Sequence, residues 1–203
     1  MLGTIHASSS ERAAELAPRF TDRSQFETLR VDPYYRFSAA SLPGVAGWID
    51  ELIGETAQVG IALVHGDYSP KNVLIRKNAC VLLDHEVAHW GDPAFDIGFA
   101  SAHFLGKANH LTDKRTDFAE AAVLFWHTYR RAVENQPWFD AVLPRIVRHT
   151  IGCTLARVAG KSTLEYLSES ERLRQRDVMV AMISDEPPTY EALIGRFAEE
   201  MNR

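Results

Sequence analysis

Two carboxylate-bearing loops, each entered from a short apolar run, constrain this chain more than any other part of its sequence. The apolar runs span residues 61–64, 73–75 and 79–83. Their length and composition predict small strands, with Asn78 at the turn between the last two. Asp67 and Asn72 then lie on the loop that joins the first strand to the second, and Asp84 follows the third. Three oxygen-bearing side chains are therefore expected to converge from loop positions, where binding and catalytic residues are concentrated.

This set of side chains meets the needs of phosphoryl transfer. Catalysis of that reaction depends mainly on positioning and on the neutralisation of phosphate charge by Mg²⁺. Mg²⁺ prefers one or two protein carboxylates together with phosphate oxygens and water, and a separate carboxylate must take the proton of the acceptor hydroxyl. Asp67 fits the role of that base. Asn72 and Asp84 fit the metal, and Glu86 is a candidate outer ligand through a water molecule.

At these positions the sequence resembles the aminoglycoside phosphotransferase and choline kinase group, which is distantly related to the protein kinases. Three blocks carry the resemblance within 34 residues and in the family's order: H-G-D-x-x-x-x-N at 65–72, L-D-x-E at 83–86 and G-D-P-x-x-D-I-G at 91–98. Each block alone is a weak signal, and the three together are a strong one. More loosely, residues 1–6 resemble the helix after the family's interlobe hinge, and residues 157–166 resemble a late helix-loop segment.

The resemblance implies roles that agree with those argued from chemistry, with Asp67 as the catalytic base and Asn72 and Asp84 as metal ligands. It adds two supporting residues. His65 would pack beneath the loop, and Asp96 would tie the loop down.

The sequence departs from the protein-kinase pattern two positions after the base, where a lysine is replaced by Ser69. Lys71 is a candidate phosphate contact, and a solvated loop lysine is the alternative interpretation.

Two simpler interpretations compete with parts of this assignment. Residues 85–89, H-E-V-A-H, match the zinc-hydrolase signature H-E-x-x-H. That chemistry needs both histidines on one face of a helix, whereas the preceding residues predict a strand and Gly91 and Pro93 would end a helix directly after the motif. A zinc hydrolase is therefore a remote alternative.

Asp92 before Pro93 predicts the first turn of a helix, with the aspartate as its N-cap.

The composition excludes several classes of partner. The chain is 46% apolar and 24% charged with a net charge of −5, which is typical of a globular protein and does not suggest nucleic-acid binding. It has no secretory signal and no apolar run long enough to cross a membrane, so a cytoplasmic protein without a membrane partner is expected. Cys80 and Cys153 lie in apolar surroundings, which predicts buried free thiols.

The fold expected is α+β and mainly α, namely the C-terminal helical lobe of a protein-kinase-like fold with a small β-hairpin carrying the catalytic loop. We expect a single domain over residues 1–203. Residues 18–43 carry three prolines and predict a long irregular connection, with room for a short helix near residues 24–29. Residues 93–105 predict a buried helix that breaks at Gly106, and amphipathic helices follow from residue 113 to the end.

A complete kinase-like enzyme also needs a Gly-rich loop over the phosphates and a strand lysine. The twelve glycines include no two that are two residues apart, so G-x-G-x-x-G is impossible here. We therefore expect the N-terminal nucleotide-binding lobe to be absent from this chain, with a fragment, an enzyme completed in cis or in trans, and a lone lobe as the three accounts.

The predicted function is phosphoryl transfer from ATP or GTP, with Mg²⁺, to a hydroxyl of a small molecule that is aminoglycoside-, choline- or sugar-like. The alternative is a non-catalytic module that binds a small molecule or a partner.

Overall fold

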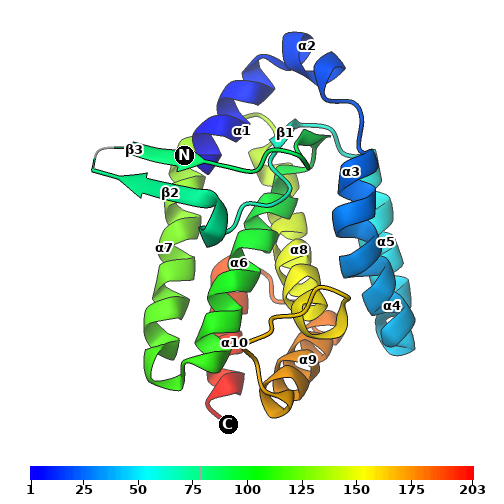
Figure 1. Cartoon of the computed structure of the whole chain (residues 1–203), viewed down its shortest axis with the longest axis vertical. Helices are drawn as coiled ribbons and strands as arrows, with labels where there is room; N and C mark the ends of the chain where they lie inside the picture. The colour runs from blue at the N-terminus through cyan, green and yellow to red at the C-terminus, as the bar shows by residue number, and fades with distance from the viewer. Residues whose placement is uncertain (78) are drawn as a thin grey trace.

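Helices form most of the chain, and two small antiparallel sheets lie near one end of them (Figure 1). The computed structural model describes residues 1–77 and 79–203, so the turn predicted at Asn78 lies outside the described residues. This architecture confirms the prediction of a mainly helical α+β fold.

The α-helices are α1 (Leu2–Glu11), α2 (Ala13–Leu16), α3 (Ser24–Phe26), α4 (Phe37–Ser41), α5 (Ala46–Gln58), α6 (Pro93–His110), α7 (Arg115–Val133), α8 (Phe139–Ala159), α9 (Glu169–Ser184) and α10 (Tyr190–Met201). A π-helix, η2, spans Glu27–Arg36, and the short 3₁₀ turns are η1 (Ala17–Arg19), η3 (Pro43–Val45), η4 (Pro70–Asn72) and η5 (Thr112–Lys114). The strands are β1 (Ala62–Val64), β2 (Val73–Arg76), β3 (Ala79–Leu82) and β4 (His89–Gly91).

The centre of the molecule is α6, which is buried along most of its length and packs most extensively against α8. Its start follows from the local sequence, because the Asp92 side chain accepts a hydrogen bond from Ala94 N–H at 3.0 Å and Pro93 occupies the first turn. The predicted N-cap is thereby confirmed. The predicted break at Gly106 is wrong, because α6 continues to His110, and a single helical glycine costs only about 1 kcal/mol relative to alanine.

Gly98 sets how closely α6 can approach α8. A Cβ atom at Gly98 would lie 2.4 Å from the carbonyl carbon of His149 and 2.6 Å from its oxygen. The two backbones therefore meet at a separation that a side chain would prevent. On the other side of α8, the His149 ring bonds to Tyr35 Oη at 2.7 Å and to Thr56 Oγ1 at 3.1 Å, which joins α8 to η2 and α5.

The two sheets are both antiparallel pairs. In the first, β1 pairs with β4, and Ala62 lies opposite Gly91. In the second, β2 pairs with β3, and Leu74 lies opposite Val81. The loop at 65–72 runs from β1 to β2 and so connects one sheet to the other. The predicted hairpin is present as β2–β3, whereas the pairing of β1 with β4 was not predicted.

Residues 18–43 are largely helical, so the prediction of an irregular connection is wrong. α3, η2 and α4 follow one another without a break from residue 24 to residue 41, with Pro33 inside η2. A proline has no N–H to donate to the preceding turn. In the i→i+5 pattern of a π-helix this removes a single backbone bond, and η2 continues to Arg36. Within the helix, Arg30 Nη1 donates to the Leu29 carbonyl at 2.7 Å, and the Arg30 side chain is only 12% exposed.

The cysteines differ in their surroundings. Cys153 is buried in α8, where burial raises the pKa of its thiol to about 12. Cys80 is exposed, so the prediction of burial is wrong for this residue, because its apolar neighbours on the β2–β3 hairpin are themselves exposed. Across the described residues, no helix combines the length and apolar character needed to cross a membrane.

Candidate active site

The 65–72 loop is held in a sharp turn at its start. Gly66 has a φ of +76°, a backbone conformation that glycine adopts readily, and a Cβ atom there would lie 2.6 Å from Val87 Cγ1. The turn places Asp67 in a buried position, with 4% of its surface exposed. The sequence H-G-D therefore needs its glycine for both backbone conformation and space.

Asp96 on α6 anchors the start of this loop. Its carboxylate accepts hydrogen bonds from the backbone N–H groups of His65 at 2.7 Å and Gly66 at 2.8 Å, and lies 3.2 Å from His6 Nε2 on α1. Burial alone would raise the pKa of Asp96, but the hydrogen bond and charge of His6 and the bond from His65 outweigh it and lower the pKa. The side chain thus lies where a residue that ties the loop down is expected.

His65 joins the 65–72 loop to the segment before Asp84. Its Nδ1 atom accepts a hydrogen bond from Asp67 N–H at 3.1 Å, so Nε2 carries the proton and donates to the Leu83 carbonyl at 3.0 Å. A second bond runs from Leu83 N–H to the Asn72 carbonyl at 2.8 Å. The two segments that carry the predicted site residues are therefore tied together by a buried ring and by backbone.

The carboxylate of Asp67 has a cation beside each of its oxygens. Arg30 Nη2 lies 3.1 Å from Oδ1, and Lys71 Nζ lies 3.1 Å from Oδ2. Asn72 Nδ2 donates to Oδ2 at 2.7 Å and to the Asp67 carbonyl at 2.9 Å. These contacts fix the orientation of the Asp67 carboxylate near the start of the loop.

Asn72 and Asp84 have oxygens free to bind a metal ion. The amide nitrogen of Asn72 is committed to Asp67, which leaves Oδ1 without a donor among the described residues. Asp84 is exposed, and its carboxylate has no hydrogen bond or ion pair in the part of the chain that the structure describes. Its φ of +66° is uncommon for a residue other than glycine and is typical of constrained functional positions. This donor set fits Mg²⁺, and the exposed Glu86 lies two residues further on.

The structure does not form a zinc site from residues 85–89. The segment is a turn followed by β4 rather than a helix. His89 is buried, its Nδ1 lies 3.0 Å from the Val87 carbonyl oxygen, and its ring lies 4.2 Å from that of Phe26, whereas His85 is exposed. Residues 1–77 and 79–203 contain no cluster of three metal-binding side chains of the His, Cys, Asp or Glu type. The zinc interpretation is therefore contradicted by the secondary structure that it requires.

Arg30 also belongs to the site, although the sequence pattern did not predict it. Besides pairing with Asp67, its guanidinium donates to the Gly66 carbonyl at 2.6 Å, and it lies over the ring of Phe99. The arginine is 37 residues before the aspartate, in a segment predicted to be irregular, so no local pattern pointed to it.

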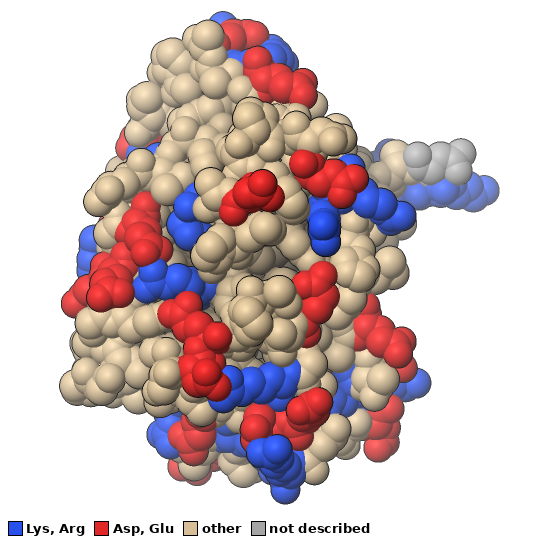
Figure 2. Space-filling view, turned by 180° about the vertical axis from the view of Figure 1, so that it is seen from behind, with Lys and Arg blue, Asp and Glu red and all other residues tan. Residues whose placement is uncertain are grey.

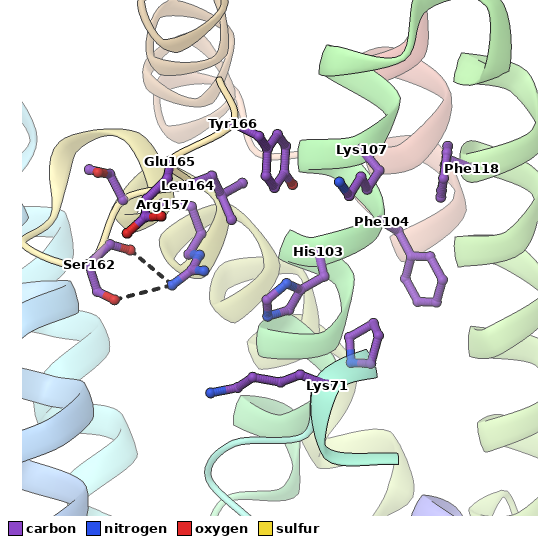
Figure 3. Close-up of a pocket in the computed structure, with 12 residues that line it drawn as sticks. Lys71, His103, Phe104, Lys107, Phe118, Arg157, Ser162, Leu164, Glu165 and Tyr166 are labelled. Carbon is purple, nitrogen blue, oxygen red and sulfur yellow. Dashed lines mark hydrogen bonds between the residues drawn. The ribbon is translucent and has the colours of Figure 1, made fainter. Parts of the chain in front are cut away.

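Two surfaces flank the loop. On one face of the β2–β3 hairpin, Leu74 and Val81 lie opposite each other and are 48% and 41% exposed, and Leu83 continues the same face at 39%. The second surface is a cavity of about 480 Å³ lined by η4, α6, α7, the end of α8 and residues 162–166 (Figure 3). An apolar strand face and a cavity that is lined in part by Lys71 thus lie beside the 65–72 loop.

Comparison with known proteins gives one positive result. The sequence model of a family described as "Phosphotransferase enzyme family" matches residues 1–135. This range contains α1, Arg30, the 65–72 loop, both sheets and α6, whereas α8, α9 and α10 lie beyond it. A search of curated proteins found no match.

Proposed function

Since the chain belongs to the phosphotransferase enzyme family, which has a kinase-like fold, we propose that it transfers the γ-phosphoryl group of ATP or GTP to a hydroxyl of a small molecule. The observation that carries this proposal is the arrangement around Asp67. A buried carboxylate is oriented by Asn72 and two cations, and the segment carrying Asp84 is bonded to the same loop.

Asp67 is the proposed general base. It is the carboxylate held near the start of the loop, and the cavity that can admit an acceptor includes the η4 turn later in the same loop. A base of this kind orients the acceptor hydroxyl and takes its proton as the new bond forms. Arg30 and Lys71 hold the carboxylate in place, and Lys71 is exposed enough to contact phosphate as well.

Asn72 and Asp84 are the proposed ligands of Mg²⁺. The ion, when bound with the nucleotide, supplies charge neutralisation at the phosphates. Asn72 offers Oδ1, because its amide nitrogen donates to Asp67. Asp84 offers a carboxylate that forms no hydrogen bond or ion pair with any described residue. Glu86 is the proposed outer ligand through water.

A nucleotide-binding N-terminal lobe, in cis or in trans, completes the enzyme in this proposal. Support comes from the exposed face of Leu74, Val81 and Leu83, because an apolar strand surface beside a catalytic loop is stabilised by a cover. The flat ring of a nucleotide base against these side chains, with the second lobe above it, provides that cover.

Phosphoryl transfer from radiolabelled ATP by the enzyme completed with its nucleotide-binding lobe tests the proposal. Asp67→Asn keeps the size of the side chain but removes the base, and should lower kcat by about 10²–10⁴-fold. Asp50→Asn, at an exposed position on α5, is the matched control and should leave kcat unchanged. Circular dichroism checks that both variants are folded. Transfer by Asp67→Asn at the rate of the control would refute the base assignment.

The metal assignment has its own test. Calorimetry should show that Asp84→Ala removes the binding of MgATP while the helical signal stays the same. MgATP binding that survives this change would exclude Asp84 as a ligand. A chain that binds small molecules but never transfers phosphate, with either nucleotide, would favour the non-catalytic binding module.

A further inference from the structure

The cavity beside the 65–72 loop has the size and position of an acceptor site. Its volume of about 480 Å³ lies within the range of small-molecule pockets. Lys71, which lines it, also pairs with Asp67 at 3.1 Å, so one residue joins the cavity to the proposed base. We name it the α6–α8 pocket, after the two helices that supply His103 and Lys107 on one side and Arg157 on the other.

The α6–α8 pocket is cationic, although the chain as a whole is acidic. Lys71, Lys107 and Arg157 line it against a single carboxylate, that of Glu165, whereas the net charge of the chain is −5. On the face of the molecule opposite to Figure 1, acidic and basic side chains are interspersed (Figure 2). The concentration of positive charge in the pocket is therefore a local feature.

Two of these cations lack a carboxylate partner. Lys71 pairs with Asp67, but neither Lys107 nor Arg157 forms an ion pair with any described residue. Figure 3 shows Lys107 on α6 beside Tyr166, and Arg157 on α8 with its guanidinium beside Ser162. Cations that line one pocket and are not neutralised by the protein favour an anionic ligand.

Arg157 is held in a fixed orientation with donors unused. Its Nη1 atom donates to Tyr34 Oη at 2.5 Å and to the Ser162 carbonyl at 2.9 Å. Its Nη2 atom has no acceptor among the described residues. Nη2 can therefore donate a charge-assisted hydrogen bond to an oxygen of a carboxylate or phosphate.

The remaining polar groups of the pocket suit a hydroxylated ligand. Lys107 Nζ lies 3.7 Å from the centroid of the Tyr166 ring, which lines the pocket. The Tyr166 hydroxyl itself is buried beside Gly106 of α6, where burial raises its pKa to about 12. Burial, together with the charges of Arg157, Lys71 and Lys107, lowers the pKa of His103 to about 4, so its neutral ring can bond to a hydroxyl.

We propose that the α6–α8 pocket binds an acceptor that carries a phosphate or carboxylate group, with Arg157 and Lys107 contacting the anion and a hydroxyl directed toward Asp67. The inference rests on the proposed phosphotransferase function and specifies its substrate class. It disfavours aminoglycosides and choline-like amino alcohols, because a cationic acceptor would meet like charges in the pocket.

Binding of three related hexoses to the 203-residue chain tests the proposal by calorimetry. Glucose 6-phosphate, glucose and glucosamine differ in charge and share a similar ring. Glucose 6-phosphate should bind at least about tenfold more tightly than the other two, the gain expected of one charge-assisted contact. Glucosamine binding as tightly as glucose 6-phosphate, or no binding of glucose 6-phosphate in the millimolar range, would overturn the proposal.

Variants locate the binding site. Arg157→Gln and Lys107→Gln should each weaken binding of glucose 6-phosphate about tenfold. Lys107→Gln is the safer variant, because Arg157 also bonds to Tyr34 and Ser162. Lys161→Gln is the matched control, since this exposed lysine is outside the pocket, and it should change the affinity by less than about twofold. Equal effects of Lys107→Gln and the control would refute the assignment.

Three further measurements separate this inference from the proposed function. Asp67→Asn should still bind glucose 6-phosphate, so loss of transfer with retained binding leaves the pocket assignment intact. Transfer to glucosamine but not to glucose 6-phosphate would refute the anionic acceptor while leaving the phosphotransferase function intact. A non-hydrolysable ATP analogue with Mg²⁺ should not displace glucose 6-phosphate, and displacement would assign the cations to nucleotide phosphates instead.

Discussion

Replacing Asp96 by asparagine tests how strongly α6 holds the 65–72 loop. The carboxylate accepts from the backbone N–H groups of His65 and Gly66 through different oxygens, whereas an asparagine has a single oxygen. The amide nitrogen of the new side chain would face the other N–H group. One buried backbone donor is thus left without an acceptor, and His6 loses its anionic partner.

The size of the effect follows from these contacts. A hydrogen bond to a charged group contributes about 1.5–3 kcal/mol, and a buried donor without a partner costs about 1–3 kcal/mol. The two terms overlap, so the free energy of unfolding should fall by about 2–4 kcal/mol. A typical domain has about 5–15 kcal/mol in total, so the variant should still fold.

Urea denaturation followed by circular dichroism measures this change, with Asp50→Asn as the exposed control. The pH dependence provides a second readout. Because the folded-state pKa of Asp96 is lowered, its contribution is complete above the ordinary value of 3.8 and is lost as the pH falls through the folded-state pKa. The free energy of unfolding of Asp96→Asn should therefore fall less than that of the unmodified protein when the pH is lowered through this range. A change below about 1 kcal/mol, equal to that of Asp50→Asn, would refute the reasoning.

Three other changes have defined outcomes. Arg30→Met should lower kcat for phosphoryl transfer about 10–100-fold by releasing the base, whereas Arg36→Met, at an exposed position in the same helix, should not; equal rates in the two variants would exclude a positioning role. Gly98→Ala should destabilise the protein by about 1–3 kcal/mol in urea denaturation, because its Cβ meets the backbone of α8, while Gly195→Ala, which has open space, should stabilise it by up to about 1 kcal/mol. Burial lowers the pKa of His149 from 6.5 to about 4, so the unfolded chain binds more protons than the folded chain between these pH values. Lowering the pH from 7 to 5 should therefore lower the free energy of unfolding by about 2 kcal/mol. An imidazole signal of His149 that titrates near pH 6.5 in NMR would contradict this.

Those parts of the candidate site that could be predicted depend on local chemistry. Asp67 and Asn72 lie five residues apart in the H-G-D-x-x-x-x-N motif, and the Asn72 side chain donates a hydrogen bond to the Asp67 carboxylate. The start of α6 follows from Asp92 and Pro93 because capping involves only neighbouring backbone groups. The apolar runs before and after the loop likewise predicted β1, β2 and β3 to within a residue or two.

Other parts were not predictable because their partners are distant in the chain. Pro33 favoured an irregular segment, yet the π-helix η2 continues through it, with Val31, Tyr34 and Tyr35 buried against the rest of the chain. Cys80 appeared buried from its neighbours, but its strand belongs to a hairpin that projects from the helices (Figure 1). In both cases tertiary contacts, or their absence, outweighed the local pattern.

The sequence by itself determined which chemical groups the loop carries and in what order, because spacing along a strand–loop–strand segment limits where Asp67 and Asn72 can lie. The tertiary structure decided what surrounds those groups. Arg30 reaches the base from η2, Asp96 reaches the loop from α6, and Arg157 faces the pocket from α8. These residues come together because burying the helices around α6 fixes their relative positions, and no spacing within the sequence encodes the distances that result.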